Sequence, residues 1–290
     1  MNTSVFFKLL NEYYWKTLQL PQRREQIFEN TVNALLHFTG YLYERRGGTV
    51  YAEVAREAIQ SNRDLLEIRT QWRRDTQERV FSDFVHLCEK YGYKQNPTHD
   101  PLKPVHRLEQ SRKRSLLEVA SPHRLQNKSL AAWASGLVRS NDIKAAFDTL
   151  AEIRGVGPKI ASFYLRDIAV LSRVNEVAGE QSYLLQPIDI WTSRAASRLN
   201  PAASKMTPKA KAETLIEFEQ NNALEIGQAN IGFWVLGSQF AGDPESFSKA
   251  IDVIRESRGT WFLFHLISQE LQLAKERCEV LEALLGSVDI

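Results

Sequence analysis

Two glycines separated by one residue, and followed by a proline and a lysine, form the part of the chain best suited to binding an anion. Gly155 and Gly157 permit a tight turn whose backbone can approach another surface closely. Pro158 suits the first position of a helix, because the amide proton that it lacks would have no partner there. The N–H groups at the start of that helix point outward together with the positive end of its dipole. The sequence therefore predicts an anion cradle at this turn, with Lys159 beside it.

Apolar residues at helical spacing on both sides of the turn indicate the elements that hold the cradle. A short helix is expected before the turn, with Phe147, Leu150 and Ala151 on one face. A second helix is expected from Pro158 to about Leu171. Its buried stripe is expected at Ile160, Tyr164 and Ile168. The bland interpretation of the same pattern is an ordinary glycine-rich turn between two packed helices.

The segment from about 145 to 171 resembles the helix-hairpin-helix motif, which binds a run of DNA phosphates without reading bases. Both glycines fit that motif, as do the upstream Leu150 and Ile153 and the small Ala161. The resemblance implies DNA contacts from the hairpin, at Gly155, Val156, Gly157 and Lys159.

An aspartate opens another predicted helix further along the chain. Asp189 follows Gln186-Pro187-Ile188, and the inner face of its helix is expected at Trp191, Ala195 and Leu199. A hairpin followed by such a helix resembles the helix-hairpin-helix DNA glycosylase superfamily, whose members include endonuclease III and 8-oxoguanine glycosylase. The segment 227–237 resembles the late helix of that superfamily, so the resemblance covers about residues 145–240.

This resemblance implies an all-α enzyme of two lobes, with DNA and an extruded base in the cleft between them. The central helical bundle would comprise residues 31–155, and the second lobe residues 1–30 plus 156–290, with the hairpin at the junction. The chain itself also indicates the all-α class, because its apolar spacing is helical nearly everywhere and no segment alternates cleanly like a strand.

The resemblance also implies catalytic roles for two side chains. In the superfamily, the aspartate that matches Asp189 stabilises the cationic sugar formed as the glycosidic bond breaks, or activates the attacking nucleophile. Capping of a helix is the competing interpretation, and it is compatible with catalysis. Lys159 matches the lysine that attacks the sugar C1′ in members with strand-cleaving activity. Its alternative role is a simple phosphate contact.

Two departures from the superfamily pattern concern the surroundings of the aspartate. The stretch from Lys159 to Asp189 is longer than usual, which suggests an inserted loop over residues 173–184. Trp191 stands where a histidine is common, and it could stack on a base or pack in the core. We expect the base pocket at Trp191 and Trp234.

The charge of the chain is unevenly distributed. Its formal net charge is +2, but residues 101–130 hold seven basic and two acidic side chains, whereas residues 241–290 hold five basic and nine acidic ones. A basic stripe attracts a phosphate backbone, so Arg112, Lys113 and Arg114 are expected to contact DNA. The alternative is a solvated basic surface.

The composition limits cofactors and location. Two cysteines are too few for a thiolate zinc site or an iron–sulfur cluster, and no histidine pair shows metal-site spacing, so no catalytic metal is expected. Nucleotide-binding glycine motifs and membrane-spanning runs are absent. The resemblance suggests that hairpin carbonyls hold a structural monovalent cation. We expect a monomeric, cytoplasmic, nucleoid-associated protein whose partner is double-stranded DNA.

The sequence leaves three functions open. The first is a DNA glycosylase of base-excision repair that flips a damaged or modified base and cuts its N-glycosidic bond, with or without AP-lyase activity. The second is the same chemistry directed at hypermodified phage bases in antiviral defence. The third is a DNA-binding protein that uses the hairpin and the basic stripe without catalysis.

Overall fold

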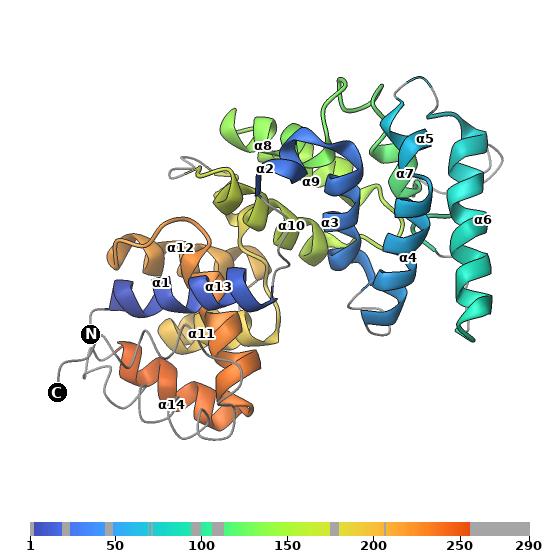
Figure 1. Ribbon diagram of the computed structural model, residues 1–290. Helices are drawn as coiled ribbons and strands as arrows, with labels where there is room; N and C mark the ends of the chain where they lie inside the picture. The colour runs from blue at the N-terminus through green and yellow to red at the C-terminus, as the bar shows by residue number, and fades with distance from the viewer. Residues whose placement is uncertain are drawn as a thin grey trace. The chain divides into compact units, whose positions relative to one another are not determined.

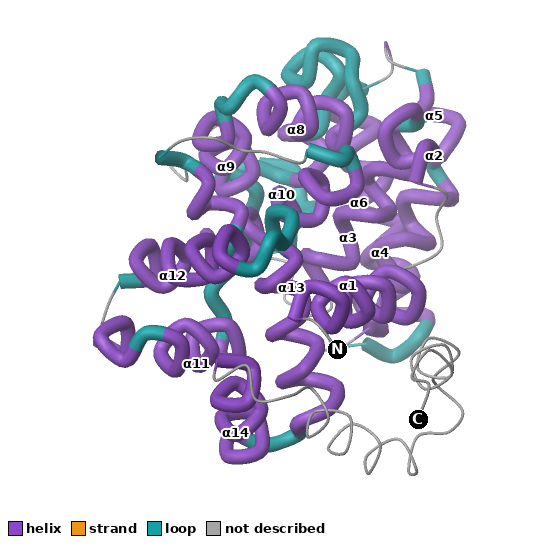
Figure 2. The backbone as a smooth tube through the Cα atoms, turned by 90° about the vertical axis from the view of Figure 1, so that its left-hand side faces the viewer, coloured by secondary structure: helices purple, strands orange, loops and turns teal. Residues whose placement is uncertain are grey.

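The computed structural model is helical throughout the residues that it describes. These are residues 3–18, 24–43, 49–68, 70, 72–93, 100–105, 113–174, 180–205 and 207–255. Within them no β-strand forms, and the one β feature is an isolated parallel bridge between Arg114 and Ile153. Figure 2 shows helices joined by loops in every described part of the chain. The predicted all-α class is confirmed for these residues.

Contacts divide the chain into two compact units, one made of Met1–Pro21 with Leu185–Ile290 and the other of Gln22–Leu184. The lobe bounds expected from the sequence lie after residues 30 and 155, which would split the helical hairpin between lobes. In the structure both hairpin helices belong to the unit Gln22–Leu184. The reason is that the second hairpin helix packs against the first and against the helices before it.

The unit Gln22–Leu184 is built around one central helix. Its helices are α2 (Arg24–Glu29), α3 (Thr31–Tyr43), α4 (Thr49–Ser61), α5 (Arg63–Glu67), α6 (Arg74–Lys90), α7 (Leu116–Val119), α8 (Leu130–Arg139), α9 (Ile143–Ala151) and α10 (Pro158–Leu171), and a 3₁₀ turn covers Ser182–Leu185. Helix α3 is buried on nearly all sides, because α4, α10, α8, α5 and α2 pack around it (Figure 1). Helix α6 lies against α4 on the side away from α10.

An ion pair is buried where α10 meets α3. Arg166 and Asp167 are about 1% and 0% exposed, and Arg166 Nε donates to Asp167 Oδ1 over 2.8 Å. Tyr41 of α3 donates its hydroxyl to Asp167 Oδ2 over 2.7 Å. Removal of one partner from such a pair leaves an uncompensated charge in a dry core. The Tyr41–Asp167 hydrogen bond therefore fixes α10, and with it the second half of the hairpin, against α3.

The unit that contains the chain termini has an aromatic core. Its elements are α1 (Thr3–Tyr13), a π-helical turn (Tyr14–Leu18), α11 (Ile190–Leu199), a 3₁₀ turn (Pro201–Lys205), α12 (Pro208–Asn221), α13 (Gln228–Val235), a π-helical turn (Leu236–Ala241) and α14 (Pro244–Arg255). Helix α1 packs against α13 (Figure 1), and the Phe7 ring contacts the rings of Phe218 and Phe233 at centroid distances of 5.5 and 4.9 Å. Gly232 allows this contact, because a Cβ there would lie 2.3 Å from Phe7 Cδ1.

No helix among the described residues is both long enough and apolar enough to cross a bilayer.

We predict opposite effects of alanine at two helical glycines. Gly232→Ala should lower the free energy of unfolding by about 1–3 kcal/mol, because the Phe7 ring must move in a packed core. Gly136→Ala in α8 is the matched control, since its Cβ would meet nothing closer than 3.9 Å. There alanine should stabilise the protein by roughly 0.5–1 kcal/mol through helix propensity. Urea unfolding of both variants measures this, and a neutral Gly232→Ala would contradict the tight contact.

Candidate functional site

The turn between α9 and α10 has the geometry that the sequence predicts for an anion cradle. Gly155 has a φ of +87°, which a side chain would make unfavourable. Gly157 is the N-cap of α10 and Pro158 its first residue. A Cβ on Gly157 would meet no atom of the chain within 4 Å, so open space lies in front of the turn. Val156 is buried and anchors the turn, since its N–H donates to Ile153 O over 3.0 Å.

Two residues of the basic stripe lie beside this turn. Arg114 forms the parallel bridge, donating its N–H to Glu152 O and accepting from Arg154 N–H, both over 2.8 Å. The Arg114 side chain pairs with Glu118 and, over 3.1 Å, with Glu152. Lys113 Nζ donates to the backbone oxygens of the hairpin itself. Arg112, the third residue expected to contact DNA, lies outside the described residues.

The residues of the hairpin do not fit a separate monovalent cation at the carbonyls that Lys113 contacts. Its ammonium donates to Ala151 O and, over 3.1 Å, to Val156 O. A metal ion bound to the same two oxygens would bring a second positive charge within a few ångströms of the first. At these two carbonyls the Lys113 ammonium therefore stands in the place of the monovalent cation that the resemblance suggests.

Lys159 is exposed at the second position of α10, next to the turn. Asp189 belongs to the other unit, so the structure describes the two candidate catalytic residues in separate surroundings.

Asp189 is the N-cap of α11 and is only half-buried. Its Oδ1 accepts the N–H groups of Trp191 and Thr192, both over 2.9 Å, and Thr192 Oγ1 accepts the N–H of Asp189 over 2.8 Å. This reciprocal capping box fixes the carboxylate in one orientation. Within the described part of the chain no donor reaches Oδ2. Oδ1 of the carboxylate thus caps the helix, while Oδ2 accepts no hydrogen bond among the described residues and could contact a substrate.

The loop that leads into Asp189 is held by buried polar groups of α12 and α13. Pro187 O accepts Nδ2 of Asn230 over 3.0 Å and Oγ1 of Thr192 over 3.1 Å. Gln186 Nε2 donates to Glu219 Oε2 over 2.8 Å, and Glu219 Oε1 accepts the N–H of Ala229 over 3.0 Å. Both side chains that reach the loop, Glu219 and Asn230, are almost fully buried. The backbone before Asp189 therefore has little freedom to move.

Burial raises the pKa of Glu219 to about 8, although the backbone N–H groups at the start of α13 and the Gln186 amide oppose the shift. A carboxyl group under the loop therefore gains its charge near neutral pH.

Both tryptophans expected in the base pocket have packing partners. The Trp191 ring contacts the Phe247 ring at a centroid distance of 5.2 Å, and it lies so close to Gly237 that a Cβ there would be 2.4 Å from the ring. Trp234 contacts Tyr14 at 5.8 Å. Both indoles are only partly buried. A role in holding a base stays a prediction for each of them.

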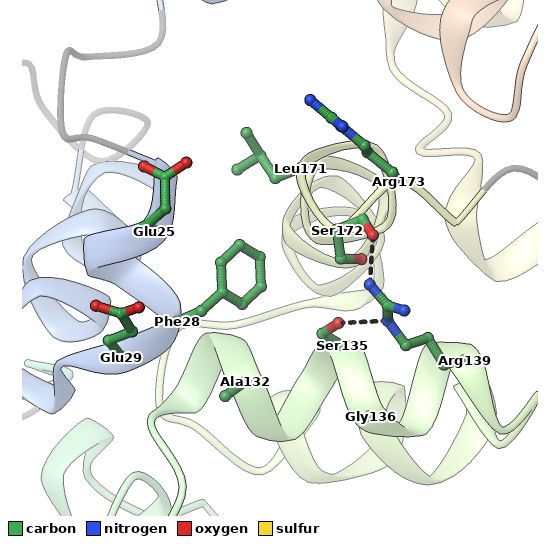
Figure 3. A pocket seen from close by; sticks show the side chains of 10 residues that line it. All are labelled: Glu25, Phe28, Glu29, Ala132, Ser135, Gly136, Arg139, Leu171, Ser172 and Arg173. Atoms are coloured by element: carbon green, nitrogen blue, oxygen red, sulfur yellow. Dashed lines mark hydrogen bonds between the residues drawn. The ribbon is translucent and has the colours of Figure 1, made fainter.

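A separate pocket of about 620 Å³ lies in the unit Gln22–Leu184, between α2, α8 and the end of α10 (Figure 3). Arg139 crosses it, donating to Ser172 O over 2.5 Å and lying 3.4 Å from Ser135 Oγ. None of the residues expected to act on DNA lines this pocket. No group of three His, Cys, Asp or Glu side chains in the described ranges is arranged to hold a metal ion.

Three buried ionisable residues near these sites were not predicted from the sequence, namely Arg166, Asp167 and Glu219. Arg166 and Asp167 stand side by side between the apolar segments Phe163–Leu165 and Ile168–Leu171, and that position is the signal of a buried pair. Glu219 gives no such signal, because it follows other acidic residues in a helix with a polar face.

We predict that Glu219 makes the stability of the protein depend on pH. Because its folded pKa is raised from 4.5 to about 8, the folded state binds the proton more tightly than the unfolded state, and stability is lost as pH rises through that window. Glu219→Gln should remove this loss, so the free energy of unfolding of the variant should rise relative to that of wild type by up to about 1.4 kcal/mol per pH unit. Glu217→Gln, at an exposed neighbour, is the control. Parallel stability profiles of Glu219→Gln and wild type would contradict the assignment.

Comparison with known proteins adds one short match. Uncharacterized protein MJECL21 of Methanocaldococcus jannaschii is 31% identical over 97 residues, which are 33% of this chain and 21% of that protein. The chain thus matches about a fifth of the length of this relative. No protein-family model matches the chain, and no solved structure is significantly similar to it.

Proposed function

We propose that this protein is a DNA glycosylase that flips a damaged or modified base out of the duplex and cuts its N-glycosidic bond. The observation that carries the proposal is the Asp189 carboxylate, which a capping box holds by one oxygen while the other has no donor among the described residues. A carboxylate fixed in this way can act on a substrate without first losing rotational freedom.

The hairpin supplies the binding energy that base flipping requires. Extrusion of a base costs a few kcal/mol, and contacts to the phosphate backbone must offset that cost. The turn at Gly155–Gly157 and the first N–H groups of α10 would bind phosphate oxygens, with the basic residues around the turn adding charge.

In the proposed reaction the bond between C1′ and the base nitrogen breaks, and the base leaves with the bonding electrons. Asp189 stabilises the positive charge that develops on the sugar. It then accepts a proton from the water that adds to C1′, and this proton passes on to the departed base anion, which leaves an abasic site, a free base and the Asp189 carboxylate as before. If the Lys159 amine attacks C1′ instead, the product is a Schiff base that leads to strand cleavage.

A non-catalytic DNA-binding protein is the second candidate, because the capping box alone would account for Asp189 as a structural residue. The two functions differ in whether the carboxylate can be replaced by another good cap.

We predict that Asp189→Asn lowers base release by about 10²–10⁴-fold while folding and DNA affinity stay as in wild type. Asparagine caps a helix nearly as well as aspartate, so a purely structural role would leave activity intact. Asp243→Asn is the matched control, since Asp243 Oδ1 also accepts two backbone N–H groups, from Glu245 and Ser246, over 2.8 and 3.0 Å. Base release is measured on duplex DNA with a susceptible base, and full activity of Asp189→Asn would remove the central residue of the proposal.

Lys159 gives a second prediction. Borohydride should trap a covalent complex between the wild-type protein and DNA containing an abasic site, because reduction makes the Schiff base permanent. Lys159→Gln should abolish trapping and leave Asp189-dependent base release measurable. If active wild-type protein gives no trapped complex, Lys159 is a phosphate contact and the enzyme lacks lyase activity.

A further inference from the structure

Two carbonyl groups of the helical hairpin converge on one ammonium group. Lys113 Nζ lies 3.1 Å from Val156 O and also donates to Ala151 O. Ala151 is the last residue of α9, where carbonyls lack partners within the helix and carry the negative end of its dipole. Val156 lies in the turn just before α10. A single positive charge therefore joins the end of one helix to the turn that starts the next.

The backbone next to Lys113 is held against the hairpin independently of its side chain. Arg114 exchanges two backbone hydrogen bonds with the segment Glu152–Arg154, each over 2.8 Å. Because the backbone of Arg114 is already fixed, placing the Lys113 ammonium at the hairpin costs little additional backbone conformational entropy. The side chains of Arg114 and Arg124 both pair with the Glu152 carboxylate, whereas Lys113 contacts the carbonyl oxygens of Ala151 and Val156.

The orientation of the carbonyl sets the orientation of an amide. In a trans peptide the C=O and N–H groups point in opposite directions, so Val156 O directed at Lys113 turns the N–H of Gly157 away from it. Gly157 is the N-cap of α10, and within the described residues its N–H donates no backbone hydrogen bond. Open space lies in front of this residue. The Lys113 ammonium therefore orients the Gly157 N–H, a donor of the anion cradle, from the opposite side of the peptide group.

We propose that Lys113 is a built-in cation of the hairpin, whose ammonium takes the place of a dissolved monovalent metal ion and makes the turn independent of Na⁺ or K⁺. Its consequence for DNA binding rests on the proposed function, whereas its consequence for the stability of the turn does not. The ammonium carries the same charge as these ions and presents three donors to carbonyl oxygens.

The test compares thermal unfolding and duplex-DNA affinity in potassium chloride and in tetramethylammonium chloride at equal ionic strength. Tetramethylammonium is too bulky to reach both carbonyls. Wild type should give the same midpoint and the same Kd in both salts. In tetramethylammonium, Lys113→Met should unfold about 4 °C below wild type and bind DNA several-fold more weakly than wild type. In potassium the variant should recover part of both losses, because a potassium ion can bind the two carbonyl oxygens that Lys113 no longer contacts.

Two further variants serve as controls. Lys128→Met removes a charge from the same basic stripe and should show no difference between the salts. Lys113→Arg keeps the charge and should behave like wild type toward the two salts, which preserves the test if Lys113→Met does not fold. A wild-type protein that is more stable in potassium, or a Lys113→Met variant that potassium does not help, would overturn the inference. Absence of DNA binding in every salt would count against the proposed function alone, because the unfolding midpoints still decide the role of Lys113.

Discussion

The turn between α9 and α10 is the constraint on which the proposed DNA contacts depend. The left-handed backbone of Gly155 lets the chain reverse within a few residues, and Gly157 and Pro158 then begin α10 with its N–H groups facing open space. Buried groups hold this geometry from two sides. Val156 and Ile153 anchor the turn in the core, and the Arg166–Asp167 pair fixes α10 against α3 through Tyr41. The N–H groups at the start of α10 and the Lys159 amine take their positions from this turn, and the Lys113 ammonium contacts carbonyl groups of the hairpin.

In the other unit, Asp189 is likewise held in place by hydrogen bonds. Backbone amides at a helix start orient its carboxylate, and a loop fixed by Glu219 and Asn230 leads into it. In both places buried polar groups restrict the movement of a side chain that the solvent can reach, and such restriction would orient a functional group before a substrate binds.

Local sequence pattern was enough to predict the helical elements but not the long-range contacts. The helix Pro158–Leu171 is confirmed as expected, because a proline at its start and a regular apolar stripe define it locally. The first hairpin helix begins earlier than the expected apolar face, at Ile143. The contact of Lys113 with the hairpin and the burial of Glu219 could not be predicted, since each depends on a segment brought close only by folding. The expected lobe bounds also differ from the compact units, because packing of α10 with α3, α8 and α9 has no local signature.

Cleavage of a glycosidic bond by this protein can be measured directly. The purified protein is incubated with duplex DNA that carries oxidised, alkylated, deaminated or hypermodified bases, and free base and abasic sites are quantified together. We predict that at least one of these substrates yields both products in equal amounts. Tight binding of the duplexes without release of base from any of them would contradict it, and would leave the hairpin as a DNA-binding device without catalysis.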